Sequence, residues 1–353
     1  MRIAVTGATG NVGTSLLEAL TARGHEVVGV VRRPPDTTTS PTYAAVDWHS
    51  VDLTSAPDEP LRRAFRGTEA VVHLAWGFQP TRDEAYLERL AVDGTRAVLA
   101  AAADAGVHQV AHMSSMGAYS AGSGRVDESW PTGGIATSAY SRHKAAAERL
   151  LDTFEAEHPG VIVSRMRPAL IGQRRAAAAL LRYTLPAAVP NAAIRLAKVL
   201  PVDRDLRLQF VHADDVAQAY VRALEGHLGG AFNLAAEPVL GPGDIAAAVG
   251  ARHVHVPFAI IRRAVDLSWR LHLQSVDAGW LDMAWQLPQL DSARAAGELG
   301  WRPAHDGRNV LVELVDAIRD KAHGDTPILR ARGVPAGIAL ALAGRSSARR
   351  RQP

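Results

Sequence analysis

Residues 2–24, RIAVTGATGNVGTSLLEALTARG, have the pattern of a strand, a glycine-rich turn and a helix. The β-branched run 2–7 is typical of a strand, and the leucine- and alanine-rich stretch 11–24 is typical of a helix that ends at Gly24. Further strands are expected at 25–31, 70–76, 109–115 and 161–168, with helices at 92–106 and 138–158. This alternation predicts an α/β fold with a doubly wound parallel sheet.

The regular pattern breaks into proline-punctuated helical pieces beyond about residue 172. We therefore predict a Rossmann-type dinucleotide-binding domain over residues 1–172, with a return segment at 206–236. A smaller, discontinuous, mostly helical substrate-binding lobe is expected from residues 173–205 and 237–325. Residues 326–353 are expected to form a basic, flexible C-terminal tail.

Composition narrows the function classes. The 353 residues include 47% apolar residues, 21% charged residues and no cysteine, which excludes disulfides, thiolate metal sites and a cysteine nucleophile. The net charge is +3, but six arginines and no acid lie beyond residue 325, which leaves −3 on residues 1–325. This body is not a nucleic-acid-binding surface. The histidines show no metal-ligand spacing, so no metal site is expected.

The two ends of the sequence bear on localisation. The first residues run straight into a strand and a glycine turn without an apolar leader, so a cytoplasmic location is expected. The apolar run near the C-terminus is far shorter than the roughly 20 residues that span a bilayer, so no stable membrane span is expected. Weak adhesion of this tail to a membrane or a partner is the alternative to a disordered end.

The glycine-rich turn between the first strand and the first helix predicts dinucleotide binding. Such a turn lets the backbone approach a pyrophosphate, whose charge is met by the N–H groups and dipole of the helix N-terminus. A tight turn with close helix packing is the alternative. The candidate contacts of this turn are Gly7, Thr9, Gly10, Asn11, Val12 and Gly13.

The second strand bears on the choice of dinucleotide. It ends with Arg32 and Arg33 and carries no acid, and arginine at this place can pair with the 2′-phosphate of NADP. NADP is therefore favoured over NAD, the alternative being that both arginines are simply solvated. Asp52 and Leu53 come where a third strand should end over the adenine.

Tyr140 and Lys144 lie four residues apart on an expected helix, so their side chains share a face. A nearby cation lowers the pKa of a tyrosine, which could then act as acid or base, and the lysine could also hold the nicotinamide ribose. A serine in HMSSMGAYS, 25 residues upstream at the sheet's carboxyl edge, could orient a substrate carbonyl for Tyr140.

Several ordered motifs together resemble the extended short-chain dehydrogenase/reductase superfamily, also called the NAD-dependent epimerase/dehydratase family. They are TGATGNVG, DL at 52–53, HLA at 73–75, VDGT at 92–95, SSMGAY at 114–119, YSRHK at 140–144, RPALIG at 167–172, FVHADDVA at 210–217 and LGWRP at 299–303. The resemblance implies Ser115, with Ser114 as the alternative, beside Tyr140 and Lys144 as the catalytic residues. It also implies a coenzyme lining from Ala75, Pro168, Ala169, Leu170 and Ile171.

Departures from the family's patterns reduce the number of reactions that this protein is expected to catalyse. Met116 and Gly117 stand where family dehydratases carry an Asp-Glu pair, so sugar dehydration is not expected. Leu170 stands where many nucleotide-sugar members have asparagine, which puts a nucleotide-sugar substrate in doubt. Trp76, just after HLA, is expected to touch the substrate. Three tryptophans of the second lobe either line an apolar pocket or pack in a core: Trp269, Trp280 and Trp285.

The sequence therefore predicts an NAD(P)-dependent reductase or dehydrogenase acting on a carbonyl/alcohol pair of a small-molecule substrate. A sugar or nucleotide-sugar epimerase that uses transient oxidation is one alternative, and a non-catalytic NADP-binding regulatory protein is another. A homodimer through the Tyr140 helix and its neighbour would fit the resemblance.

Overall fold

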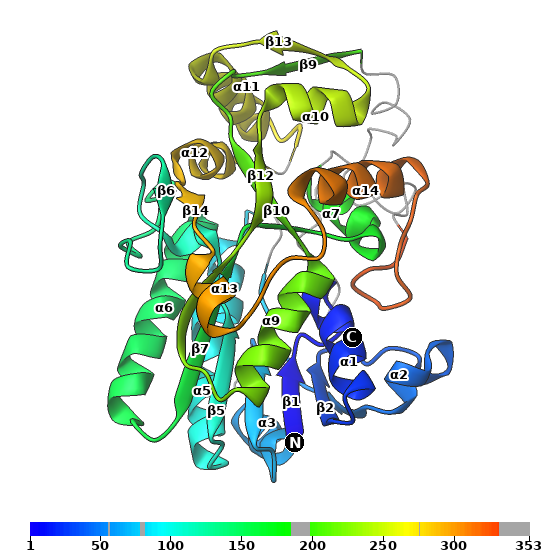
Figure 1. Cartoon of the computed structure of the whole chain (residues 1–353), viewed down its shortest axis with the longest axis vertical. Coiled ribbons are helices and arrows are strands. Elements are labelled where there is room, and N and C mark those ends of the chain that lie inside the picture. The colour runs from blue at the N-terminus through cyan, green and yellow to red at the C-terminus, as the bar shows by residue number, and fades with distance from the viewer. Residues whose placement is uncertain (56, 78–81, 185–197, 275, 332–353) are drawn as a thin grey trace.

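The computed structural model describes residues 1–331 except 56, 78–81, 185–197 and 275. A seven-stranded sheet with helices on both faces forms the lower part of the molecule in Figure 1, and smaller sheets and helices form the upper part. The sheet order is β11-β7-β5-β4-β1-β2-β3, and every neighbouring pair is parallel. Its strands are β1 Arg2–Thr6, β2 Glu26–Val31, β3 Asp47–Ser50, β4 Ala70–His73, β5 Gln109–Met113, β7 Ile162–Pro168 and β11 Gly230–Leu234.

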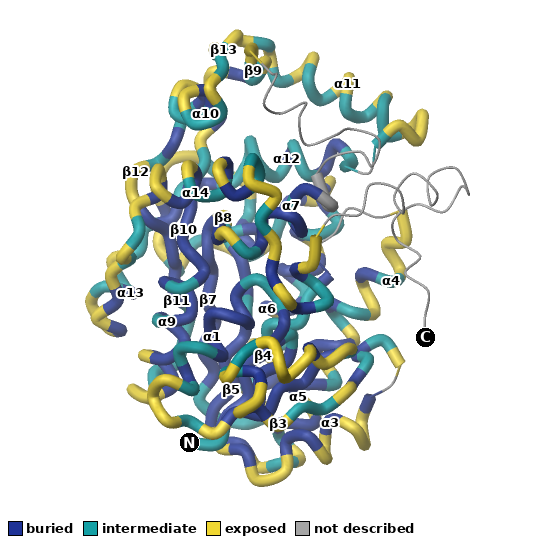
Figure 2. The backbone as a smooth tube through the Cα atoms, turned by 90° about the vertical axis from the view of Figure 1, so that its right-hand side faces the viewer, coloured by how far each residue is buried: buried dark blue, intermediate teal, exposed yellow. Residues whose placement is uncertain are grey.

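Two cores, one on each face of this sheet, explain why its central strands β1 and β4 are rich in buried apolar residues. On β1, Ile3 and Val5 face one core and Ala4 faces the other, since successive side chains of a strand point to opposite faces. The first core packs against α1 Asn11–Ala22 and α9 Ala213–Glu225. The second packs against α3 Asp58–Phe65, α5 Gly94–Asp104 and α6 Ala139–Glu157. Figure 2 shows the strands between these helices as the most buried part of the chain.

The fold has the alternation that the sequence predicts, including a first helix that ends just before Gly24, whose φ is +78°. The remaining helices near this sheet are α2 Pro41–Ala44 and α4 Glu84–Glu88. A π-helical turn, Arg89–Asp93, leads into α5, and single 3-10 turns lie at Thr37–Thr39, Met116–Ala118 and Arg174–Ala176.

The upper part is built from three small sheets and the later helices (Figure 1). The sheets pair β12 Ala236–Leu240 with β10 Leu208–His212 and β8 Leu170–Gly172, β13 Arg252–His255 with β9 Val199–Val202, and β14 Gln289–Leu290 with β6 Arg125–Val126. The helices are α7 Ala177–Thr184, α10 Pro242–Val249, α11 Phe258–Arg270, α12 Ala278–Gln286 and α14 Gly307–Arg319, whereas α13 Ala293–Glu298 packs on the first core of the main sheet through Ala295.

Two segments differ from the sequence-based expectation. Within the predicted return segment, β11 pairs in the main sheet and α9 packs on one face of it. By contrast, β10 pairs with β8 and β12 in a separate sheet. At the start of the predicted flexible tail, Thr326 and Leu329 are buried, with 0% and 1% of their surface exposed, and residues 332–353 of that tail lie outside the described residues. Within residues 1–331, apart from the gaps given above, no helix is long and apolar enough to cross a membrane.

Candidate active site

The turn between β1 and α1 has a shape that only glycine allows. Gly7 has a φ of +70°, and a Cβ on it would lie 2.7 Å from the Ala75 backbone nitrogen. A Cβ on Gly13 would collide with the Gly7 carbonyl oxygen. The turn therefore packs closely on α1 and on the chain that leaves β4.

The N-terminus of α1 fits a coenzyme pyrophosphate. The helix starts after Gly10, whose N–H donates to the Gly7 carbonyl oxygen (2.9 Å), and it has neither a side-chain cap nor an acidic residue in its first turn. Its first N–H groups and the positive end of its dipole are thus available to a phosphate group, since no local carboxylate occupies them.

Asn11 ties this turn to the end of the predicted coenzyme lining. Its side-chain amide donates to the Ile171 carbonyl oxygen (3.2 Å), and the Gln173 amide donates to its Oδ1 (2.8 Å). The structure thus brings Ile171 and the phosphate turn together, although they are 160 residues apart. Val12, 4% exposed, instead belongs to the core beneath the turn.

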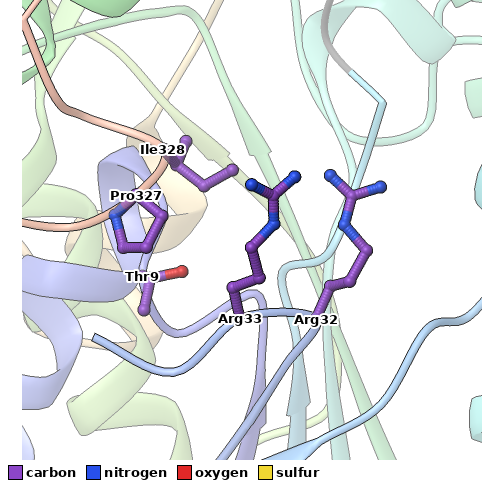
Figure 3. A pocket seen from close by; sticks show the side chains of 5 residues that line it. All are labelled: Thr9, Arg32, Arg33, Pro327 and Ile328. Atoms are coloured by element: carbon purple, nitrogen blue, oxygen red, sulfur yellow. The ribbon is translucent and has the colours of Figure 1, made fainter. Parts of the chain in front are cut away.

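The end of β2 lies beside the same turn. Arg32 and Arg33 line a small hollow together with Thr9, Pro327 and Ile328 (Figure 3). The Arg32 guanidinium also donates to the Tyr86 hydroxyl (3.2 Å). Two guanidinium groups thus lie beside the phosphate turn, where they could hold an anionic group of a dinucleotide.

The other predicted coenzyme residues have varied surroundings. The Asp52 carboxylate accepts from the Thr54 backbone N–H (3.0 Å) and hydroxyl (2.7 Å), so it shapes its own loop. Leu53 is buried in the second core. The Ala169 N–H donates to the Leu234 carbonyl oxygen (2.9 Å) in continuation of the β7–β11 pairing, which Pro168 ends. Leu170 is 39% exposed.

A buried hydrogen-bond chain positions Ala75, and sequence reasoning missed it. The Ala75 N–H donates to the Thr6 hydroxyl (3.3 Å), which lies 2.6 Å from His73 Nδ1, while His73 Nε2 lies 3.0 Å from the Thr95 hydroxyl. Because the Thr95 hydroxyl donates to the Ala91 carbonyl oxygen (2.6 Å), we assign a neutral His73 with its proton on Nε2. Burial lowers the pKa of His73 to about 3.

The structure brings Ser115, Tyr140 and Lys144 together at the carboxyl edge of the sheet. Helix α6 begins after its N-cap Ser138 and carries Tyr140 in its first turn. Ser115 follows β5, accepts from the Gly117 N–H (3.0 Å) and hydrogen-bonds through its side chain to Tyr140. Lys144 is 1% exposed, and its Nζ donates to the Met113 carbonyl oxygen (2.6 Å) at the end of β5.

The pKa of Tyr140 does not follow the expectation that Lys144 lowers it. Burial raises the pKa of Tyr140 to about 12, and the hydrogen bond from Ser115 opposes this only in part. Although Tyr140 keeps some exposed surface, its ring lies 5.2 Å from that of Trp280 and 6.3 Å from that of Trp76. Tyr140 is therefore a neutral phenol near pH 7.

Lys144 contacts the Met113 carbonyl oxygen and the face of the Trp76 ring. Its Nζ lies 3.3 Å from the centre of the Trp76 ring and 5.9 Å from that of Tyr140. Burial lowers the pKa of Lys144 well below its ordinary value, and the carboxylate of Glu148 opposes this shift. A ring face stabilises a desolvated ammonium, so Trp76 offsets part of the burial penalty.

Helix α12 covers the other side of Tyr140. Trp280 packs on the Tyr140 ring, and Met283 lies near Gly117, on which a Cβ would be 3.3 Å from the sulfur and 2.9 Å from Tyr140. Of the tryptophans left undecided between pocket and core, Trp280 thus borders Tyr140. Trp285 stacks on Phe258, with ring centres 4.8 Å apart. Trp269, on α11, contacts the guanidinium of Arg82.

A buried ion cluster under the site separates the roles of the two serines. Glu148, one turn after Lys144 and 1% exposed, accepts from Arg167 at 2.8 and 3.0 Å and from Arg165 at 3.1 Å. The Ser114 hydroxyl also donates to Glu148 (2.5 Å). The Ser114 side chain therefore belongs to this cluster, and Ser115 is the serine that hydrogen-bonds to Tyr140. The pattern of the sequence did not point to Glu148.

Fold and site together define a dinucleotide-binding α/β enzyme. A family model described as the NAD dependent epimerase/dehydratase family matches residues 3–235. The chain therefore belongs to the NAD-dependent epimerase/dehydratase family, which confirms the resemblance seen in the sequence.

Two relatives share part of their sequence with this chain. An uncharacterized protein of Mycobacterium tuberculosis is 28% identical over 325 residues, or 91% of this chain but 30% of that protein. This chain thus spans less than a third of that relative. A 4-hydroxy-2-methyl-3-oxo-4-farnesyl-3,4-dihydroquinoline-1-oxide ketoreductase of Stigmatella aurantiaca is 32% identical over 173 residues, covering 48% of this chain and 50% of the relative.

Solved structures share the fold. The UDP-glucose 4-epimerase of Thermus thermophilus, in complex with NAD, superposes with a TM-score of 0.66 and 22% identity, covering 90% of this chain and 99% of that one. At that identity the likeness shows the fold alone.

Proposed function

We propose that this protein is an NADP-dependent reductase that converts a carbonyl group of a small, partly apolar substrate into an alcohol, and the reverse. The observation that carries this proposal is the meeting of Tyr140, Ser115 and Lys144 beside the phosphate turn, with Tyr140 held as a neutral phenol. The bound nicotinamide would supply the hydride in reduction and accept it in oxidation.

Tyr140 is suited to donate a proton to the substrate oxygen. With a pKa of about 12, its hydroxyl is protonated near pH 7 and can give its proton to an oxygen that gains negative charge. The oxidation direction needs the phenolate, which burial disfavours. The raised pKa of Tyr140 thus favours catalysis of reduction over catalysis of oxidation near neutral pH.

Ser115 and Lys144 complete the proposed machinery. The single O–H of Ser115, which points to Tyr140 here, can turn to donate to the substrate carbonyl and hold it within reach of the phenol. Lys144, whose Nζ donates to the Met113 carbonyl oxygen at the end of β5, would also hydrogen-bond the nicotinamide ribose. In this role Lys144 positions the coenzyme, and Trp76 holds its ammonium in the same place.

The preference for NADP rests on Arg32 and Arg33 at the end of β2, beside Thr9. Arg32→Ala should raise the Kd for NADPH by about tenfold while changing that for NADH less than about twofold, since only NADPH carries the 2′-phosphate. Arg62→Ala, which removes an exposed arginine paired with Asp104, is the matched control. Equal losses for both coenzymes would mean that NADP is not selected here.

The surroundings of Tyr140 favour an apolar substrate over a sugar. Trp76, Trp280 and Met283 border the catalytic pair, and Leu170 stands in place of the asparagine of many nucleotide-sugar enzymes. The ketoreductase of Stigmatella aurantiaca, whose name gives a farnesyl-bearing quinoline compound as its substrate, supports this choice. Epimerases among the solved structures keep the alternative of transient oxidation open to test.

Net coenzyme consumption separates the two reactions. A panel of aromatic and terpenoid aldehydes and ketones, offered with NADPH, should give stoichiometric loss of the reduced coenzyme and a matching alcohol. UDP-glucose and UDP-glucuronic acid serve as the sugar arm of the panel. Epimerisation of a nucleotide sugar without net coenzyme turnover, and no reduction of any carbonyl compound, would refute the reductase assignment.

A further inference from the structure

The chain that follows α14 returns to the phosphate turn. The Thr326 hydroxyl, on a residue that is 0% exposed, donates to the Thr9 carbonyl oxygen (2.8 Å). Thr9 lies within the glycine-rich turn, 317 residues earlier in the chain. A segment from the far end of the described chain is thus bonded directly to the turn that faces the coenzyme.

This segment is held as a compact turn. The N–H groups of Leu329 and Arg330 donate to the Thr326 carbonyl oxygen at 3.1 and 3.0 Å, and the Gly324 N–H donates to the Leu329 carbonyl oxygen (3.0 Å). Leu329 is 1% exposed and packs with Ala176 and Ala179 at the start of α7. These contacts fix the two residues between Thr326 and Leu329 in place.

Those two residues, Pro327 and Ile328, form one side of the hollow that Thr9, Arg32 and Arg33 complete. Figure 3 shows Pro327 next to Thr9, and Ile328 next to the guanidinium of Arg33. Two arginines and a threonine hydroxyl can bind a phosphate, while a proline and an isoleucine exclude water from one side.

We propose that Thr326–Ile328, called here the C-terminal wall, is part of the coenzyme site and covers the 2′-phosphate of NADP. This inference rests on the proposed NADP preference and adds a wall that comes from the opposite end of the chain. The wall displaces water from the guanidinium groups, which strengthens their attraction to the phosphate because the local dielectric falls. It thereby increases the preference for NADP over NAD.

The test uses two ligands that differ in one phosphate, 2′,5′-ADP and 5′-AMP, titrated calorimetrically into the full chain. Ile328→Glu places a negative charge beside Arg33, and Ile328→Gln has nearly the same shape without the charge. We expect the glutamate variant to bind 2′,5′-ADP about tenfold more weakly than the glutamine variant, with less than about a twofold difference for 5′-AMP. Val254→Gln, at an exposed apolar residue on β13, is the control and should match wild type for both ligands.

Hydrogen exchange of the wild-type chain gives a second readout that needs no variant. Backbone exchange of residues 324–331 should slow with 2′,5′-ADP and remain nearly unchanged with 5′-AMP. If wild type prefers 2′,5′-ADP but the Glu and Gln variants bind it equally, the wall is wrong and the NADP preference stands. If wild type binds both ligands equally, the NADP preference fails and the wall fails with it.

Discussion

Two buried histidines beside the active site should make this protein lose stability in mild acid. His112 is 1% exposed, and neither of its ring nitrogens has a hydrogen-bond partner among the described residues. Its ring centre lies 5.2 Å from that of His73, whose pKa burial lowers to about 3. Burial also lowers the pKa of His112 well below its ordinary value, and His73 and Lys144 add to this shift.

The sign and size of the effect follow from proton binding. Below the unfolded pKa of about 6.5 the unfolded chain takes up a proton at each histidine and the folded chain does not, so the free energy of unfolding falls as pH falls. Between about pH 7.5 and about pH 5.5 this loss is about 1.4 kcal/mol for each histidine. His73 and His112 together should therefore remove about 3 kcal/mol over that interval.

Urea denaturation of wild type and His112→Leu at both pH values measures this contribution. The variant should lose about 1.4 kcal/mol less than wild type between the two pH values, whatever its stability at the higher pH. His108→Gln, which removes a histidine that is exposed in the folded chain, is the control and should follow wild type. The same pH dependence in wild type and His112→Leu would show that His112 does not stay neutral in the folded protein.

Three further predictions concern the buried ion cluster around Glu148, the phosphate turn, and Tyr140 as the proton donor and acceptor. Glu148→Gln should lower the free energy of unfolding by about 3–5 kcal/mol in urea denaturation, because Arg167 then stays buried without the carboxylate that it pairs with, whereas Arg165 keeps Asp152 and Glu155; unchanged stability would contradict the role given to the cluster. Gly13→Ala should abolish coenzyme binding in calorimetry, whereas Gly24→Ala should preserve it, since a Cβ there meets nothing within 4 Å although φ is +78°. Alcohol oxidation should accelerate with rising alkaline pH as Tyr140 begins to ionise, and a flat profile in steady-state kinetics would argue against Tyr140 as the base.

The sequence predicted the fold well because the signals for it are local. The β-branched run before Gly7 and the leucine-rich stretch after Gly13 each determine one element, and their alternation determines the layers. The family resemblance likewise pointed to Tyr140, Lys144 and Ser115, which the structure brings together. That grouping agrees with the prediction, while the chemical role of each residue stays a prediction.

What the sequence could not supply depends on contacts between distant residues. Glu148 looks like an ordinary charge on an alanine-rich helix until Arg165 and Arg167 meet it from β7. The raised pKa of Tyr140 has a similar origin, since it results from burial in a site where α12 supplies Trp280.

The C-terminal wall was missed for a compositional reason. Residues beyond 325 are arginine-rich and contain a low-complexity stretch, which is typical of a disordered end. The contacts of Thr326 with Thr9, and of Leu329 with α7, have no counterpart in local sequence. Dimerisation through the Tyr140 helix, α6, and its neighbour also stays a prediction, which sedimentation of the purified chain would test.

The most direct test of the proposed mechanism is the separation of coenzyme binding from turnover in Tyr140→Phe. The phenylalanine keeps the ring against Trp76 and Trp280 but has no proton to give. NADPH should bind with a Kd within about threefold of wild type, while reduction of a substrate found in the carbonyl panel should slow by a factor of about 100 or more. Turnover at the wild-type rate, with binding intact, would contradict the assignment of Tyr140 as the proton donor.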